Sequence, residues 1–290
     1  MKFFSKRIIT LIFVVVIIVA GVLWAITFKT SPEPLPEVIE EGIEPKQEII
    51  GKSVEGRKIE SYTFGNGADR LLFVGGVHGG YEWNSVVLAY KFIDYLKANP
   101  EVITDNLTVA VIPSLNPDGV FKIISKEGRF AIADVKVEKE ETKSGRFNAN
   151  GVDLNRNFDC KWKPESMWQG NVVSAGTKPF SEPESKALRD FILKNKPVAA
   201  IFWHSQSNAV YASECEKGIL PETREIMNTY SKVSGYPAVD SFDHYEITGD
   251  VEGWLASINI PAITVELKTH ETIEWDRNLL GIKALFDYYK

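Results

Sequence analysis

Apolar runs bounded by glycine, proline and charged residues recur through most of the chain. Four of them contain almost no polar residue, which predicts strands buried on both faces, because a half-exposed strand would alternate. These runs cover residues 70–77, 107–113, 197–203 and 261–267. In other segments apolar residues recur at helical spacing, which predicts helices over residues 82–98, 181–195 and 275–289. Strands alternating with helices predict an α/β domain with a mixed, largely parallel central sheet and helices on both faces.

Local signals refine two of these boundaries. Ser181 stands three residues before Glu184, which predicts a capping box at a helix start, and Pro183 is tolerated in the first turn. The strand predicted over residues 107–113 is followed by "SLNPDG", whose residues favour a turn.

The N-terminal segment departs from this pattern. Residues 8–28 carry no charge, and this run is about as long as the roughly 20 residues that a membrane-spanning helix needs. Basic residues precede it, which favours a cytoplasmic N-terminus at residues 1–7 and an uncleaved anchor at residues 8–28. A cleaved signal peptide, which would release a secreted protein, is the alternative. Both interpretations put the rest of the chain outside the cytoplasm, with a single pass through the cell membrane in the first.

The remainder divides into two parts. Residues 29–48 are rich in proline and glutamate and predict an extended linker. Residues 49–290 have an ordinary globular composition without internal repeats, so we expect one compact domain. The whole chain is 44% hydrophobic and has a formal net charge of -6, which argues against a nucleic-acid partner, because phosphate binding requires a basic face.

The two cysteines, Cys160 and Cys215, allow only one pairing. An oxidising compartment favours a disulfide between them. Two buried thiols or a metal site are the alternatives, although neither cysteine belongs to a Cys-x-x-Cys sequence.

Ionisable residues follow or end three of the predicted strands. His78 and Glu82 come after the first, His204 after the third, and Glu266 lies in the last. Ligands bind at the carboxyl ends of strands in open α/β sheets, and two histidines with one carboxylate form the ligand set of a catalytic zinc site. A second carboxylate such as Glu266 can then take a proton from the zinc-bound water. Taken singly, each residue also fits a structural role; a phosphate loop at the glycines beside His78 lacks the Gly-Lys-Ser/Thr that should follow.

The stretch "GVDLNRNFD" and, in order, "SEPES", "FWHS", "YEITGDVEGW" and "ITVEL" resemble the zinc carboxypeptidase family of the carboxypeptidase A type, in its bacterial, membrane-anchored form. The likeness extends from about Ser53 to the last helix. It implies the zinc carboxypeptidase fold and one zinc ion held by His78, Glu82 and His204. It also implies that Glu266 activates the attacking water.

In one respect the chain departs from the family. The family's first motif has its histidine and glutamate three apart, whereas His78 and Glu82 are four apart, with Tyr81 inserted. Asp118 is the nearest alternative carboxylate, although "NPDG" favours a turn residue there. His244 and His270 are left as surface residues or as residues that support the ligands.

The resemblance also implies a substrate site. Asn155 and Arg156 would hold the terminal carboxylate of a peptide, since a guanidinium matches a carboxylate with two charge-assisted bonds. Arg146 would polarise the scissile carbonyl, with Arg129 as its rival. Tyr245 resembles the family's mobile tyrosine, which closes on the bound terminus.

The resulting hypothesis is a metallocarboxypeptidase that acts outside the cytoplasmic membrane on peptides with a free terminal carboxylate. Counting from the family's tyrosine puts Glu252 at the floor of the side-chain pocket, which favours a cationic end group such as lysine, arginine or diaminopimelate. The alternatives are a peptidase or amidase of murein stem peptides in cell-wall turnover, and a catalytically inactive peptide-binding relative.

Overall fold

The computed structural model describes residues 17–18, 24, 44–243 and 245–290, with the backbone only at residue 139. The chain divides into the units Met1–Glu41 and Gly42–Lys290, and the second contains every element discussed below. Apart from residues 17, 18 and 24, the anchor expected at residues 8–28 lies outside the described residues. Among the described residues, no helix has the length and hydropathy of a membrane span.

A mixed sheet of eight strands forms the centre of the second unit, in the order β1-β2-β4-β3-β7-β12-β8-β11. The four strands expected from the apolar runs are its parallel centre, and antiparallel pairings occur only toward the two edges. This confirms the predicted class of sheet. The strands are β1 (Lys46–Lys52), β2 (Lys58–Gly65), β3 (Asp69–Val74), β4 (Leu107–Ile112), β7 (Ala199–Ser205), β8 (Ala209–Ala212), β11 (Ala238–Val239) and β12 (Ala262–Leu267).

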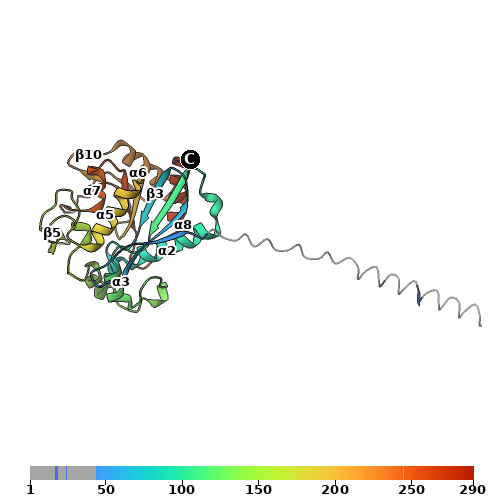
Figure 1. The fold of residues 1–290 in the computed structure, drawn as a ribbon, viewed down its shortest axis with the longest axis horizontal. Coiled ribbons are helices and arrows are strands. Elements are labelled where there is room, and N and C mark those ends of the chain that lie inside the picture. The colour runs from blue at the N-terminus through green and yellow to red at the C-terminus, as the bar shows by residue number, and fades with distance from the viewer. Residues whose placement is uncertain (1–16, 19–23, 25–43, 244) are drawn as a thin grey trace, which may run out of the picture. The chain divides into compact units, whose positions relative to one another are not determined.

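Helices cover both faces of this sheet, with α2 and α8 on one side and α5 and α7 on the other (Figure 1). Alternate residues of β7 explain its unbroken apolar run: Trp203 joins the core under α2, α6 and α8, whereas Phe202 joins the core under α5 and α7. The helices are α2 (Trp83–Ala98), α3 (Pro117–Ile124), α4 (Lys139–Thr142), α5 (Pro183–Asn195), α6 (Pro221–Ser234), α7 (Val251–Ser257) and α8 (Trp275–Tyr288).

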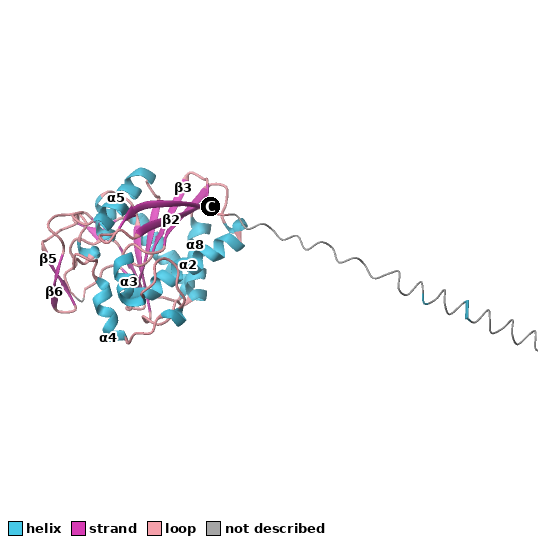
Figure 2. Cartoon of the chain, turned by 60° about the horizontal axis from the view of Figure 1, so that its bottom comes forward, coloured by secondary structure: helices cyan, strands magenta, loops and turns pink. Residues whose placement is uncertain are grey.

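Two short hairpins lie outside the main sheet, and the β5–β6 hairpin stands well apart from it in Figure 2. The hairpins are β5 (Glu165–Trp168) with β6 (Asn171–Ser174), and β9 (Glu214–Cys215) with β10 (Gly218–Ile219). Single turns of 3-10 helix complete the loops: η1 (Gly79–Glu82), η2 (Pro100–Val102), η3 (Ile132–Asp134), η4 (Lys143–Arg146) and η5 (Leu154–Arg156).

One local prediction was incomplete, and another was wrong. The "SLNPDG" segment is not only a turn, because Asn116 accepts a hydrogen bond from the backbone N–H of Gly119 and thereby starts α3. The predicted capping box of α5 does not form, although the helix does. Glu184 instead accepts bonds from the side chain of Asn148 and the backbone of Val54, both at 3.1 Å.

Candidate active site

The turn between β3 and α2 delivers two metal-ligand types from one short segment. Its glycines are required by close packing: a Cβ at Gly80 would lie 2.6 Å from the carbonyl oxygen of Gly119, and one at Gly79, where φ is +48°, would lie 2.6 Å from that of Gly145. The chain therefore makes a single 3-10 turn, and the extra residue between His78 and Glu82 does not separate their side chains.

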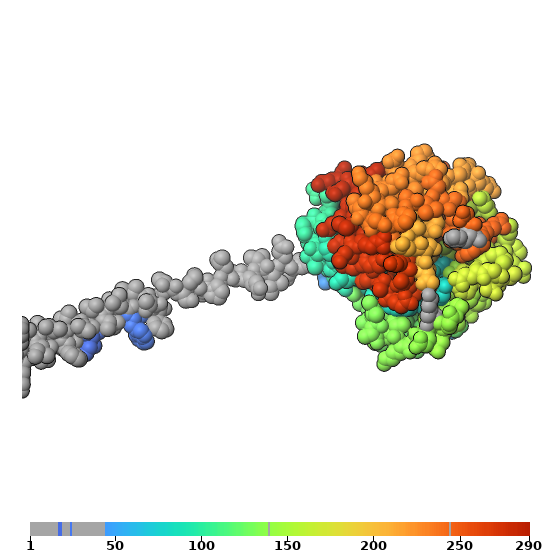
Figure 3. Space-filling view, turned by 180° about the vertical axis from the view of Figure 1, so that it is seen from behind, coloured from blue at the N-terminus to red at the C-terminus, as the bar shows by residue number. Residues whose placement is uncertain are grey.

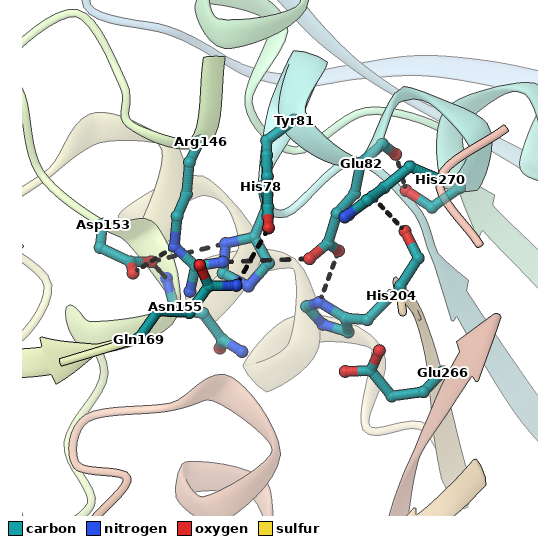
Figure 4. A network of polar contacts seen from close by, with 12 residues as sticks. His78, Tyr81, Glu82, Arg146, Asp153, Asn155, Gln169, His204, Glu266 and His270 are labelled. Carbon is teal, nitrogen blue, oxygen red and sulfur yellow. Dashed lines mark hydrogen bonds and ion pairs between the residues drawn. The ribbon is translucent and has the colours of Figure 1, made fainter. Parts of the chain in front are cut away.

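His78, Glu82 and His204 form a buried cluster at the carboxyl edge of the sheet (Figure 4). Their candidate ligand atoms all lie within 4.8 Å of one another, and no more than 4% of any of the three residues is exposed. His78 comes from the end of β3 and His204 from β7, the strand beside it. Asp118 is not part of this cluster, because it bonds with Ser53 and Arg57 at the start of α3.

Two carboxylates contact the ring of His204. Its Nδ1 lies 3.0 Å from Oε2 of Glu82, and its Nε2 lies 3.1 Å from Oε1 of Glu252. Burial alone would lower the pKa of His204, but the negative charges of Glu82 and Glu252 outweigh it and raise that pKa well above its usual value. By contrast, burial and the nearby charge of Arg146 hold the pKa of His78 well below its usual value.

Glu266 lies beside this cluster because β12 pairs with β7, and Glu266 is directly opposite His204 in the register. Its carboxylate accepts a bond from the backbone N–H of Ser207 at 3.2 Å. Burial, followed by repulsion from Glu82, raises the pKa of Glu266 to about 7. A carboxyl group with such a pKa is suited to proton transfer near neutral pH.

Arg146, in η4, is fixed by a carboxylate that the sequence analysis overlooked. Its Nε donates to Oδ2 of the fully buried Asp153 at 2.8 Å, and Nη1 lies 3.9 Å from Glu82. The other oxygen of Asp153 lies 3.5 Å from Nδ1 of His78, so this residue links the arginine to a metal-ligand candidate. The only sequence feature that could have indicated this role for Asp153 is its place in "GVDLNRN", two residues before Asn155. Arg129, the rival to Arg146, is instead paired with Asp94 on the surface.

Asn155 and Arg156 occupy the short turn η5, where Asp153 accepts a bond from the N–H of Asn155 at 3.1 Å. The side-chain oxygen of Asn155 accepts from the backbone N–H of Val251 at 2.9 Å. Arg156 is 2% exposed, and its guanidinium donates to the carbonyls of Asn155 and Met167 at 2.6 and 3.2 Å. The fold therefore holds this arginine in one position before any ligand arrives.

One cavity of about 670 Å³ is lined by the His-Glu-His cluster, Glu266, Arg146, Asn155 and Arg156. The surface is hollowed where yellow-green and orange segments meet in Figure 3. Tyr245 lines the cavity, and the centre of its ring lies 4.9 Å from that of Phe242. Burial raises the pKa of Tyr245. Glu252 and Asp250 add acidic groups to the same wall.

Two acids at the start of α7, its N-cap Asp250 and Glu252, have pKa shifts in opposite directions. Burial and the negative charge of Glu252 raise the pKa of Asp250 to about 6. Burial opposes the ionisation of Glu252, but the hydrogen bond and charge of His204, together with hydrogen bonds from the backbone and from Asn155, lower its pKa. Glu252 therefore serves as a support for His204 as well as a lining residue, which the sequence did not indicate.

The remaining sequence-based candidates are also located. Cys160 and Cys215 form a disulfide, with Cα atoms 6.1 Å apart, so the predicted pairing is confirmed. Cys160 lines the cavity, and the bond connects the segment after Arg156 with β9, the short strand that follows β8. His270 is buried rather than on the surface, with Nδ1 2.9 Å from Oγ of Ser205. His244 lies outside the described residues.

A buried His-Glu-His cluster with a further acid at the carboxyl edge of an α/β sheet defines the site of a metal-dependent hydrolase. The family model of zinc carboxypeptidases matches residues 45–275, so the chain belongs to the zinc carboxypeptidase family. This is a family of zinc peptidases and related hydrolases, which confirms the resemblance noted in the sequence.

Curated relatives of the chain include a bacterial endopeptidase and a bacterial murein peptide amidase. Gamma-D-glutamyl-L-diamino acid endopeptidase 1 of Lysinibacillus sphaericus is 28% identical over 238 residues, covering 75% of this chain and 59% of that protein. Murein peptide amidase A of Escherichia coli K12 is 33% identical over 131 residues, which are 42% of this chain and 50% of the relative. The chain thus spans about three fifths or less of the length of these proteins.

Solved structures agree on the fold. Murein-tripeptide amidase MpaA from Escherichia coli O157 aligns with a TM-score of 0.61 at 24% identity, over 85% of this chain and 96% of that one. Bovine thrombin-activatable fibrinolysis inhibitor aligns with a TM-score of 0.68 at 18% identity, over 84% of this chain and 90% of the other.

Proposed function

We propose that this chain is a zinc-dependent carboxypeptidase that releases the C-terminal residue of peptides outside the cytoplasmic membrane. One observation carries the proposal: the metal-ligand cluster, Glu266 and the Asn155–Arg156 pair all line a single cavity. One bound peptide could therefore place its scissile bond beside the cluster and its terminal carboxylate beside Arg156.

The residues of the cluster fit a zinc ion. Two imidazoles and a carboxylate are the donor set of catalytic zinc, and the three groups converge in a buried site. The carboxylates of Glu82 and Glu252 beside His204 bring negative charge into a buried site. This charge favours the binding of a cation, because a bound cation would compensate it. Zinc bound by His78, Glu82 and His204 would polarise the scissile carbonyl and lower the pKa of the attacking water.

The chain's own residues perform the remaining tasks. Glu266 takes a proton from the attacking water and delivers it to the departing amine, a role that matches its raised pKa. Arg146 donates to the carbonyl oxygen as negative charge develops on it, and its bond to Asp153 fixes the guanidinium in advance. Asn155 and Arg156 bind the terminal carboxylate.

The acidic wall of the cavity favours a cationic C-terminal side chain. Glu252 is ionised because its pKa is lowered, and it lies within the lining of the cavity. A lysine, arginine or diamino acid would neutralise this charge, whereas an acidic end group would add to it.

A second candidate is the hydrolysis of murein stem peptides in cell-wall turnover. The relatives named for a γ-D-glutamyl-L-diamino acid bond and for murein peptides favour it. The acidic wall fits the amino group of a diamino acid equally well. The two candidates therefore share the residue that is released and differ in the part of the substrate that precedes the scissile bond.

The location is proposed from the sequence alone: residues 8–28 anchor the chain in the cell membrane with residues 1–7 in the cytoplasm. Release of the full protein into the medium, with a new N-terminus after the apolar run, would instead establish a cleaved signal. Separation of membranes from medium, followed by N-terminal sequencing, distinguishes the two.

The test of the activity is mass spectrometry of peptides incubated with the zinc-loaded protein. Matched peptides ending in Lys, Phe or Glu are supplied as free acids and as amides, together with stem tripeptides and tetrapeptides. Loss of one residue from free acids only, fastest for Lys, supports the carboxypeptidase. Cleavage of stem peptides alone supports the second candidate. Zinc binding without any cleavage would point to an inactive peptide-binding relative.

A further inference from the structure

The β5–β6 hairpin contacts the substrate site although it is not part of the main sheet (Figure 2). In β5, the hydroxyl of Ser166 lies 2.9 Å from that of Thr248, in the loop that carries Tyr245. The next residue, Met167, accepts a bond from Nη2 of Arg156 at 3.2 Å. One short strand therefore touches both the loop that carries Tyr245 and the arginine proposed for the terminal carboxylate.

The third residue of this series, Trp168, packs against Arg146. The guanidinium carbon of Arg146 lies 4.6 Å from the centre of the indole ring, and a second aromatic ring, that of Tyr81, lies 5.9 Å from it. Asp153 fixes the Nε edge of the same guanidinium at 2.8 Å. An ion pair at one edge and an aromatic ring against the face leave the arginine few alternative orientations.

Tyr81 secures the indole in turn. The two rings meet edge to face with centroids 5.2 Å apart. The hydroxyl of Tyr81 accepts a bond from Nε2 of Gln169 at 3.3 Å (Figure 4). Tyr81 is the residue inserted between His78 and Glu82. The insertion thus connects the metal-ligand turn to the tip of the hairpin.

These aromatic residues are not part of the main hydrophobic cores. Tyr81, Trp168 and Val173 form a small separate cluster, with Phe147 and Tyr245 packed against it. Loss of the indole should therefore affect the site more than the global stability of the domain.

We propose that Trp168 is a positioning residue for Arg146, held in place by Tyr81 and Gln169. This proposal rests on the proposed function: Trp168 keeps the guanidinium of Arg146 directed at the carbonyl oxygen of the scissile bond. Such a group contributes in the transition state, because a donor fixed in advance needs no reorganisation when charge develops.

The test compares three variants with the full zinc-loaded protein. Trp168→Leu keeps apolar volume but removes the ring face, and should lower kcat about 10- to 30-fold, the range of a desolvated cation–π contact, with KM within about twofold. Trp168→Phe keeps a ring and should retain most of kcat. Val172→Ala, in the same hairpin at a residue that is 63% exposed, is the matched control and should change neither constant.

A double-mutant cycle distinguishes positioning from a general structural role. If Trp168 acts through Arg146, then Trp168→Leu added to Arg146→Ala should lower kcat less than about twofold further. Effects that multiply in full, or a rise in KM equal to the fall in kcat, would overturn the proposal.

A second measurement does not depend on turnover. The Nε–H resonance of Arg146, assigned by its loss in Arg146→Lys, should be shifted by the indole ring current and should move in Trp168→Leu. An unmoved resonance refutes the contact whether or not peptides are cleaved. A shifted resonance in a protein that cleaves nothing would leave the positioning intact and refute the proposed function instead.

Discussion

Replacing Glu266 with glutamine should stabilise the metal-free protein in a pH-dependent way. The pKa of Glu266 rises from the ordinary 4.5 to about 7, so the folded state holds its proton more tightly than the unfolded state does. The stability that this provides is fully present below about pH 4.5 and is lost as the pH rises through about 7. Glutamine mimics the protonated acid and should avoid that loss.

The size of the effect follows from the shift. A change of one pKa unit corresponds to about 1.4 kcal/mol, so the upper limit is about 3 kcal/mol, and water in the cavity reduces this to about 1 to 3 kcal/mol. Urea unfolding in a chelator, at pH 4.5 and at pH 8, measures the difference between Glu266→Gln and the parent. We expect almost no difference at pH 4.5 and a more stable variant at pH 8. A difference that is the same at both pH values would refute the reasoning.

Zinc supplies the complementary half of this experiment. A cation in the cluster favours the ionised carboxylate, so saturating zinc should shrink the pH 8 difference between the two proteins. Zinc at 100 times the dissociation constant of the parent should add about 2.7 kcal/mol to the parent and less to the variant, because a neutral amide attracts the cation less than a carboxylate does. Activity should nevertheless fall about 10²- to 10⁴-fold in the variant, because its amide cannot accept the proton.

Four further predictions concern recognition and scaffold. Arg156→Lys should raise KM for free-acid peptides about tenfold or more through loss of the two-pronged contact, as measured by steady-state kinetics, and an unchanged KM would contradict the carboxylate-binding role. Glu252→Gln should slow peptides ending in Lys selectively, and equal slowing of peptides ending in Phe would contradict an electrostatic pocket. Reducing the bond between Cys160 and Cys215 should cost about 2 to 4 kcal/mol of stability and lower activity, and thermal melting unchanged after complete reduction, checked by thiol titration, would argue against this. Gly80→Ala should abolish zinc binding, measured by metal content, because its Cβ would collide with a neighbouring backbone carbonyl, and normal zinc content in a folded variant would disprove the steric argument.

Much of the fold could be read from the sequence because the central strands are buried on both faces. The runs of β3, β4 and β7 are almost entirely apolar, and the run of β12 is interrupted only by Thr264 and Glu266, which line the cavity. The edge strands carry weaker signals: β1 has a burial pattern without clear alternation, and β11 has only two residues. Such strands depend on their neighbours rather than on their own sequence.

The site was predictable where strands end in ionisable residues and less so where loops supply the support. His78 and His204 follow apolar runs, which marks them at once. The roles of Asp153 and Trp168 depend on contacts between segments that no local pattern encodes. The capping box failed for the same reason, since Glu184 bonds to Asn148 from a distant loop instead of to its own helix.

The pairing of β7 with β12 has a wider consequence. His204 and Glu266 are opposite each other in one hydrogen-bonded register, so a ladder of backbone bonds fixes the spacing between a candidate metal ligand and the proposed proton acceptor. The residues proposed to meet the substrate, by contrast, lie outside the main sheet, in the turns η4 and η5, in the loop of Tyr245 and at the start of α7. Such a division lets evolution exchange the substrate of the enzyme one loop at a time while the reacting groups keep their separation.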